Sequence, residues 1–141
     1  MHAVLVTPKG NIAFRFHRSV APKTVENFVK LARKGFYDGT KWHRVIDNFV
    51  IQGGCPNGDG RGGPGYTIEA ELSDRKHLRG TVALARGQRL DSGGSQFYIC
   101  RSSLPHLDGQ YAIFGTVTAG LDVVDKIAKD DDLTRVAIVE E

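Results

Sequence analysis

The chain has 141 residues, of which 40% are hydrophobic and 25% are charged, and its formal net charge is +3. These values are typical of an ordinary globular protein, and the length suits one hydrophobic core, so we expect residues 1–141 to form a single domain. The sequence has no run of about 18 apolar residues, which excludes a transmembrane helix. The basic residues are scattered, which argues against a nucleic-acid-binding surface.

The amino terminus, MHAVLVTPKGN, has neither the apolar segment nor the small-residue cleavage site of a signal peptide. We therefore expect a cytoplasmic protein. The two cysteines, Cys55 and Cys100, lie far apart and form no CxxC pair. In the cytoplasm such cysteines are expected to be free, partly buried thiols rather than a disulfide.

The first 35 residues predict a β-hairpin followed by a helix. Residues 2–7 and 11–16 alternate apolar and polar side chains around Pro8-Lys9-Gly10, which is typical of two strands and a turn. A helix is expected to open at Pro22, where no backbone N–H is needed, and to stop at Gly35. Its apolar residues recur at i, i+3, i+4 and i+7, as one stripe: Val25, Phe28, Val29 and Ala32.

Residues 41–54, KWHRVIDNFVIQGG, are the stretch around which the others are arranged. They predict a short apolar strand that carries Arg44, a polar turn at Asp47-Asn48, and a second apolar strand that ends in Gln52 and two glycines. The apolar neighbours of Arg44 suggest that it is buried. The alternative is that Arg44 forms an ion pair on the surface.

A long loop rich in glycine and proline follows, over residues 53–66. It contains the glycine spacing of a dinucleotide-binding motif at 58, 60 and 63. However, that motif needs a helix at its last glycine, and here Pro64-Gly65 intervenes before the strand-like residues 66–72. We therefore expect a surface loop along the rim of a groove, since long loops in compact domains tend to be functional.

The remaining elements are mostly strands. They are expected at 80–85, 95–101, 112–118 and 134–141, with a second helix over 120–129 and a solvated acidic turn at 130–132. Strands outnumber helices and turn residues recur. An antiparallel β-barrel with a helix over each open end accounts for this pattern, because closure removes exposed strand edges.

The sequence contains few of the motifs that usually mark catalytic groups. Ser95 in GGSQF lacks the last glycine of a nucleophile elbow, and the five histidines show no metal-ligand spacing. We therefore expect no metal and no cofactor. Instead, residues 41–54, 93–100 and 104–115 together suggest a shallow apolar groove with one fixed positive charge.

Three segments, WHRVIDNFVIQGG, GSQFYI and HLDGQYAIFG, in this order and at these separations, resemble the cyclophilin family of peptidyl-prolyl cis-trans isomerases. The resemblance runs from residue 3 to residue 139. It implies a mainly β fold, a closed eight-stranded antiparallel β-barrel capped by two α-helices. It also implies an isomerase that acts on X–Pro bonds of unfolded or flexible chains, assists protein folding and needs no cofactor.

This activity agrees with the missing acid–base and nucleophilic groups. Rotation about an X–Pro bond is slow because amide resonance imposes a barrier of about 18–20 kcal/mol. No covalent bond breaks, so no nucleophile is needed. A donor at the prolyl nitrogen and a dry pocket for the ring are enough, and arginine is a donor that is always protonated.

The resemblance also implies the site. Arg44 matches the catalytic arginine, Gln52 the glutamine that braces it, and Phe49 part of the pocket wall. The substrate-binding positions that match are His43, Val50, Ala85, Arg86, Gln96, Tyr98, His106, Leu107 and Tyr111. Among these, Ala85 and Arg86 match the positions that bind residues preceding proline. Phe49, Tyr98 and Leu107 could instead be plain core residues.

Five positions depart from the commonest family pattern: His106 for tryptophan, Tyr111 for histidine, Tyr98 for phenylalanine, Arg86 for asparagine and Cys55 for aspartate. We expect them to change substrate preference and inhibitor affinity more than activity. The expected partners are proline-containing polypeptides and, with reduced affinity, cyclosporin-type cyclic peptides. We expect a monomer that binds neither nucleic acid nor membrane.

Two other functions stay open at this point. A proline-peptide binding module of the same fold would bind without turnover, and an intact Arg44 and Gln52 favour the enzyme over it. A barrel that binds nucleic acid would reveal itself through the salt dependence of oligonucleotide binding.

Overall fold

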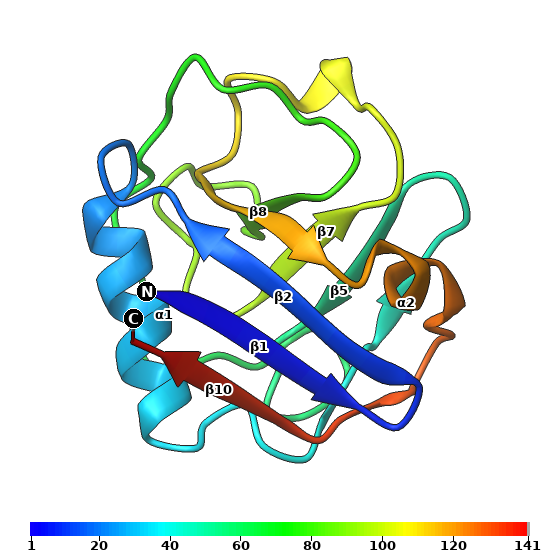
Figure 1. Ribbon diagram of the computed structural model, residues 1–141. Helices are drawn as coiled ribbons and strands as arrows, with labels where there is room; N and C mark the ends of the chain where they lie inside the picture. Colours follow the sequence, from blue (N-terminus) through cyan, green and yellow to red (C-terminus); the bar gives the residue numbers. More distant parts are fainter. Residues whose placement is uncertain (141) are drawn as a thin grey trace.

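The computed structural model describes residues 1–140 and is built on one curled antiparallel sheet (Figure 1). Its eight strands are β1 (His2–Thr7), β2 (Gly10–Phe16), β4 (Arg44–Val45), β5 (Val50–Gly53), β6 (Thr81–Leu84), β7 (Phe97–Cys100), β8 (Ile113–Ala119) and β10 (Arg135–Val139). They are arranged in the order β10-β1-β2-β8-β6-β7-β5-β4. Every neighbouring pair is antiparallel.

A small second sheet links the two edges of this curled sheet. It pairs β3 (Thr40–Lys41) with β9 (Asp132–Leu133). β9 leads directly into the edge strand β10, and β3 leads through Trp42 into the other edge strand, β4. Backbone hydrogen bonds join the two sides: Trp42 N to Asp131 O at 2.9 Å and Asp130 N to Trp42 O at 2.8 Å. The predicted fold of eight antiparallel strands with two helices is confirmed, as a strongly curled half-barrel whose edge strands β10 and β4 do not pair directly.

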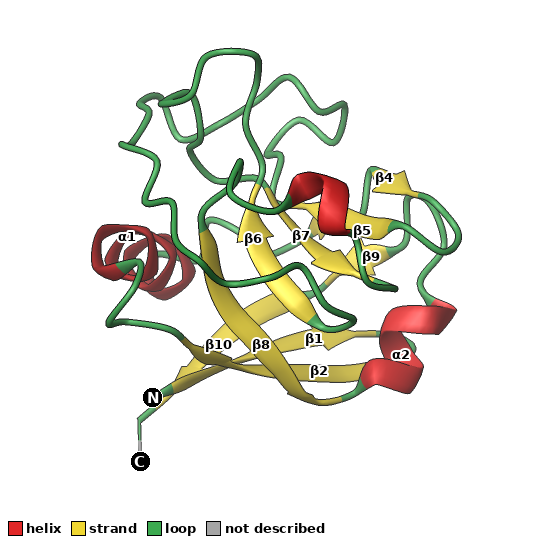
Figure 2. Ribbon diagram, turned by 90° about the horizontal axis from the view of Figure 1, so that it is seen from above, coloured by secondary structure: helices red, strands yellow, loops and turns green. Residues whose placement is uncertain are grey.

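Two α-helices lie on opposite sides of the curled sheet (Figure 2). They are α1 (Pro22–Arg33) and α2 (Leu121–Lys126), and a short 3-10 helix, η1, spans Pro105–Leu107. α1 ends as predicted, because Gly35 takes the left-handed conformation with φ +73°. No helix within residues 1–140 is long and apolar enough to cross a bilayer.

α2 is shorter than the predicted 120–129. It stops at Lys126, and Ile127 is extended. The guanidinium of Arg101 donates to the carbonyls of Val124 and Ile127, at 2.9 and 2.6 Å. The last backbone bond of this end runs from Ile127 N to Val123 O at 3.2 Å, and the Arg101 side chain then occupies the Val124 carbonyl that another turn of helix would use.

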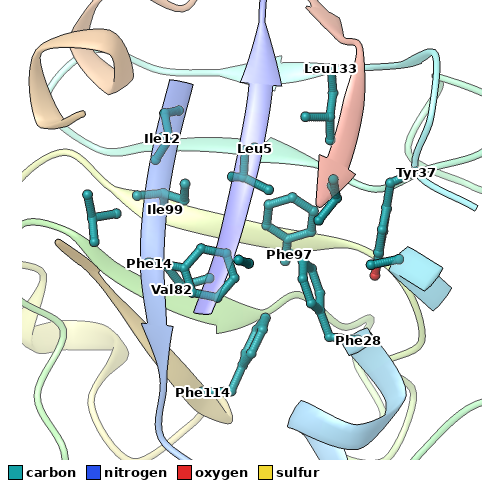
Figure 3. Close-up of a cluster of buried hydrophobic side chains, with 14 of the residues drawn as sticks. Leu5, Ile12, Phe14, Phe28, Tyr37, Val82, Phe97, Ile99, Phe114 and Leu133 are labelled. Carbon is teal, nitrogen blue, oxygen red and sulfur yellow. The ribbon is translucent and has the colours of Figure 1, made fainter. Parts of the chain in front are cut away.

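The barrel interior is filled by aromatic and branched side chains (Figure 3). Phe28 projects from α1 into the centre, with its ring centroid 5.6 Å from that of Phe14, 5.5 Å from Phe97 and 5.4 Å from Phe114. Its ring also stacks on Tyr37 at 5.0 Å. The apolar stripe predicted for this helix therefore closes one end of the core.

Apart from Gln52, which is half-buried, the strands β5, β6 and β7 carry buried side chains on both faces. In β7, Phe97 and Ile99 point into the barrel, whereas Tyr98 and Cys100 point outward, since side chains alternate along a strand. The outward residues form a second buried cluster: Val50, Ala83, Tyr98, Cys100, Leu104 and Ile113. This outer layer, and not the barrel interior, supplies the apolar surface on which a site can form.

The segment 66–72 differs from its strand-like prediction. Its one ladder contact is an isolated bridge from Ile68 to Gly93. Glu71 instead accepts hydrogen bonds from the backbone N–H groups of Lys23 and Thr24, at 3.2 and 2.6 Å, in the first turn of α1. The segment is therefore tied to a helix by side-chain bonds rather than to a sheet by backbone bonds.

Two surface predictions change as well. The acidic turn is not merely solvated, because Asp131 pairs with Lys9 at 2.6 Å and Asp132 pairs with Lys41. Both cysteines are free, as predicted, and both are fully rather than partly buried. Of the last predicted strand, 134–141, the structure assigns Arg135–Val139 to β10, and residue 141 lies outside the described residues.

Candidate active site

The site begins with the register of four neighbouring strands. Arg44 of β4 lies opposite Gln52 of β5, Gln52 lies opposite Tyr98 of β7, and Tyr98 lies opposite Ala83 of β6. Residues directly opposite each other in antiparallel strands share one face of the sheet. A charge, an amide, an aromatic ring and a small residue therefore form one row across the outer face of the barrel.

A pocket of about 190 Å³ lies over this row, and we call it the Arg44 pocket. It is lined by Arg44, Phe49, Val50, Gln52, Ala85, Arg86, Tyr98, Leu107 and Tyr111. Every one of these residues belongs to the set expected from the sequence. Phe49 and Leu107 are half-buried and face the pocket, which argues against the plain core role considered for them.

Arg44 is exposed, so the expectation that it is buried was wrong. Its Nη1 donates to Gln52 Oε1 at 3.2 Å, and its guanidinium carbon lies 5.5 Å from the centroid of the Phe49 ring. Within residues 1–140 it has no carboxylate partner, which also removes the surface ion pair as an explanation. The short strand β4 lies at the sheet edge, which leaves the far side of this side chain open to solvent.

A chain of amides holds the Arg44–Gln52 pair in place. Gln52 Nε2 donates to Gln96 Oε1 at 3.1 Å, and Gln96 Nε2 donates to the carbonyls of Gly60 and Gly62, both at 2.9 Å. Because each amide has a donor on one side and an acceptor on the other, their orientations are fixed by the network. The glycine-rich loop therefore orients the pocket's polar edge.

Gln96 lines a second, adjoining pocket of about 400 Å³, which we call the Gln96 pocket. The two pockets share Gln52, Ala85 and Arg86. Residues 60–63 of the long loop form part of its lining, as expected for a loop along the rim of a groove. The two pockets therefore adjoin each other along the three residues that they share.

Of the three residues expected at the rim, only Tyr111 lines the Arg44 pocket. His106 stacks on Phe49, with centroids 5.9 Å apart and planes at 18°. Tyr111 lines the Arg44 pocket, and the Arg86 guanidinium lies 4.7 Å above its ring. His43 is half-buried outside the pocket; its Nδ1 is buried and has no hydrogen-bond partner within residues 1–140, and burial lowers its pKa.

Comparison with known proteins settles the family. A family model described as cyclophilin type peptidyl-prolyl cis-trans isomerase/CLD matches residues 2–140. The chain belongs to the cyclophilin family. It is a peptidyl-prolyl cis-trans isomerase, which confirms the fold and the activity that its motifs imply.

Individual relatives match over most of their length. A peptidyl-prolyl cis-trans isomerase of Helicobacter pylori is 49% identical over 139 residues, covering 96% of this chain and 85% of the relative. Peptidyl-prolyl cis-trans isomerase B of Bacillus subtilis is 44% identical over 136 residues, covering 95% and 94%. A cyclophilin-type isomerase of Cryptosporidium parvum, solved in the presence of the dipeptide Ala-Pro, superposes with a TM-score of 0.93 at 30% identity over 100% of both chains.

In the present chain, two residues that the sequence reasoning did not single out, His77 and Asp108, lie directly behind the Arg44 pocket. His77 Nε2 is 2.8 Å from the Tyr98 hydroxyl, and His77 Nδ1 is 3.0 Å from Asp108 Oδ1. In the sequence, His77 is marked by nothing beyond its spacing to the other histidines, which shows no metal-ligand pattern. No short motif could have marked this group, because its members come from three separate segments of the chain.

Proposed function

We propose that this cyclophilin isomerises X–Pro bonds of unfolded or flexible polypeptides in the Arg44 pocket, with Arg44 as the hydrogen-bond donor to the prolyl nitrogen. The observation that carries the proposal is that the Arg44 side chain is held in place by its neighbours. Gln52 and the Phe49 ring fix one side of its guanidinium at the edge of an apolar pocket. Its remaining N–H groups are available to a bound peptide.

The chemistry follows from amide resonance. The prolyl nitrogen lone pair makes the X–Pro bond partly double, and a donor that draws on that lone pair lowers the rotation barrier. Phe49, Tyr98 and Leu107 offer an apolar surface for the proline ring, where little water competes for the donor. Because the interaction strengthens as the bond twists, it stabilises the transition state more than the bound peptide.

The Gln96 pocket suits the residues that precede proline, since it continues from the Arg44 pocket past Ala85 and Arg86. The Cryptosporidium relative solved in the presence of Ala-Pro supports a proline-containing peptide as the ligand. The monomeric state, the cytoplasmic location, the single domain over 1–141 and weak cyclosporin binding stay predictions.

The proposal can be tested by NMR exchange on a short X–Pro peptide, with and without a chelator. Without a catalyst, interconversion takes tens to hundreds of seconds. We expect the enzyme to make exchange between the cis and trans signals much faster than this, and we expect the chelator to leave the rate unchanged. Backbone shifts on titration should be confined to β4, β5, β7, residues 104–111 and the residues that line the Gln96 pocket.

Three results would contradict the proposal. NMR shifts centred on another face of the protein would show that the peptide binds there and not in the Arg44 pocket. Binding without accelerated exchange would identify a peptide-binding module. Activity lost with the chelator would reject the metal-free chemistry.

A further inference from the structure

His77 connects two walls of the Arg44 pocket without lining it. Its side chain is 0% exposed, and both ring nitrogens are bonded, Nε2 to the Tyr98 hydroxyl at 2.8 Å and Nδ1 to Asp108 Oδ1 at 3.0 Å. Its backbone is held as well: the N–H donates to Asp108 Oδ1 at 2.7 Å, and the carbonyl accepts from Leu104 N at 2.8 Å. One residue thus binds β7 on one side and residues 104–108 on the other.

β7 and residues 104–108 each contribute to the pocket surface. Tyr98 and Leu107 both line the Arg44 pocket, and Asp108 is the residue directly after Leu107. The rings of His77 and Tyr98 are nearly parallel, with centroids 5.9 Å apart and planes at 12°. Tyr111, also in the lining, packs edge-on against Tyr98 at 5.7 Å. The separation of the Tyr98 ring from the Leu107 segment is therefore set through His77.

One arrangement of protons satisfies the whole group. Asp108 accepts from the His77 backbone N–H, which helps to lower the pKa of its carboxyl, so Asp108 is ionised and Nδ1 must carry the ring proton. Burial lowers the pKa of His77, which keeps the ring neutral and makes Nε2 an acceptor. Burial raises the pKa of Tyr98, whose hydroxyl therefore donates to Nε2. The proton of the Tyr98 hydroxyl is thus committed to His77 and is not offered to a ligand.

We propose that His77 and Asp108 are positioning residues that fix the spacing between the Tyr98 ring and the Leu107 wall, and with it the fit of the bound proline ring. This inference rests on the proposed function of the Arg44 pocket. The two walls contact the ring in the bound peptide and in the transition state alike. Loosening them should therefore weaken peptide binding much more than turnover at saturation.

The test compares variants that keep or remove one bond of this group. In His77→Asn the amide can still donate to Asp108, but nothing reaches the Tyr98 hydroxyl. We expect the dissociation constant of a short X–Pro peptide, measured by NMR titration, to rise about three- to tenfold. The exchange rate of the saturated enzyme should stay within about twofold. His77→Gln, whose longer amide reaches the Nε2 position, should recover part of the affinity.

A double variant shows whether the Tyr98–His77 bond is responsible. Tyr98→Phe and His77→Asn each remove it, so the double variant should bind the peptide no more weakly than His77→Asn alone. Additive losses in the double variant would show that the two residues act independently and would overturn the inference.

His17→Asn is the matched control. His17 is also a buried histidine, 4% exposed, with Nε2 2.7 Å from Thr116 Oγ1, but it lies before α1 and away from the lining of the Arg44 pocket. Both variants should unfold at a lower temperature than the parent, and only His77→Asn should lose affinity while folded. Equal affinities of His77→Asn and parent, or equal losses in both variants, would overturn the inference. A parent that binds the peptide on another face would instead overturn the proposed function and the inference with it.

Discussion

Arg44 and Gln52 are direct pairing partners across β4 and β5, and Arg44 Nη1 donates to Gln52 Oε1 over 3.2 Å. The backbone register brings the two side chains to the same face, and the amide network from Gln96 fixes which end of Gln52 meets the guanidinium. A guanidinium is planar and has five donors, so one edge can be held while another faces a ligand. The geometry thus depends on shape as well as on charge.

Arg44→Lys should lose most of the activity although the net charge is unchanged. A lysine ammonium is a compact, strongly hydrated charge on a flexible stem, so Gln52 cannot hold it while it also serves the prolyl nitrogen. We expect kcat/KM to fall about 100-fold, the typical cost of one lost transition-state donor. The affinity for a proline peptide should fall far less, because the missing interaction belongs mainly to the transition state.

Two further variants act as controls for this series. Arg44→Ala should lose somewhat more activity than Arg44→Lys, and Gln52→Ala less than either, since the donor survives but is held loosely. The thermal unfolding of each variant must be checked first, so that a misfolded barrel is not mistaken for a lost donor. Parent-like turnover by folded Arg44→Lys would mean that positive charge alone is enough.

His106→Trp should strengthen the binding of cyclosporin. His106 stacks on Phe49 at the pocket rim, and it is smaller than an indole, which also offers an N–H donor. We expect a gain on the order of 1–3 kcal/mol, the size of a hot-spot contact. The measurement is calorimetric titration of the parent and of His106→Trp.

His106→Phe separates the two properties of the indole in this comparison. It supplies an apolar face without a donor, so its affinity should lie between those of the parent and His106→Trp. Equal affinities in all three proteins would mean that this position does not limit cyclosporin binding.

Much of the site could be predicted from the family resemblance, because most of its residues lie in the three short stretches that carry the motifs, 41–54, 93–100 and 104–115. Strand alternation places Gln96 and Tyr98 on one face, and the 41–54 hairpin places Arg44 opposite Gln52. The helix α1 was equally predictable, since its apolar residues follow a 3.6-residue period.

The wrong predictions share a physical cause, because each depended on long-range contacts. Arg44 has apolar sequence neighbours but lies on an edge strand, where solvent reaches it. The strand-like residues 66–72 are held by Glu71 at the start of α1, 47 residues away from Thr24 in the chain. The buried arginine is instead Arg101, whose partners in α2 cannot be inferred from its own stretch.

Arg101→Met should destabilise the protein by about 2–4 kcal/mol. The Arg101 side chain is 7% exposed, and its guanidinium bonds the carbonyls of Val124 and Ile127, which would lose their donors in a dry environment. Denaturant unfolding measures the loss. Asp47→Ala is the control, because Asp47 is the 99% exposed ion-pair partner of Arg101 and should matter by less than about 0.5 kcal/mol. Equal effects of the two substitutions would mean that the surface ion pair, not the carbonyl bonds, stabilises α2.

The stability of this cyclophilin should fall as the pH drops from about 6.5 to about 4. Burial, helped by the charges of Arg75 and Arg15, lowers the pKa of His17 to about 4 from the ordinary value of 6.5. Below pH 6.5 the unfolded chain binds a proton at this histidine and the folded protein does not, so protons favour unfolding. The stabilisation that His17 contributes is complete above pH 6.5. It falls by about 3 kcal/mol between pH 6.5 and pH 4 and changes no further below pH 4.

His17→Asn isolates this contribution from those of the other groups that titrate in acid. The variant loses the bond to Thr116 at every pH, so its unfolding free energy should be lower than that of the parent at pH 7. Its dependence on pH between 6.5 and 4 should be flatter, because no proton binds at residue 17 when the chain unfolds. The two curves should therefore converge toward pH 4. The measurement is urea unfolding at half-unit pH steps, and parallel curves would show that His17 titrates alike in the folded and unfolded states.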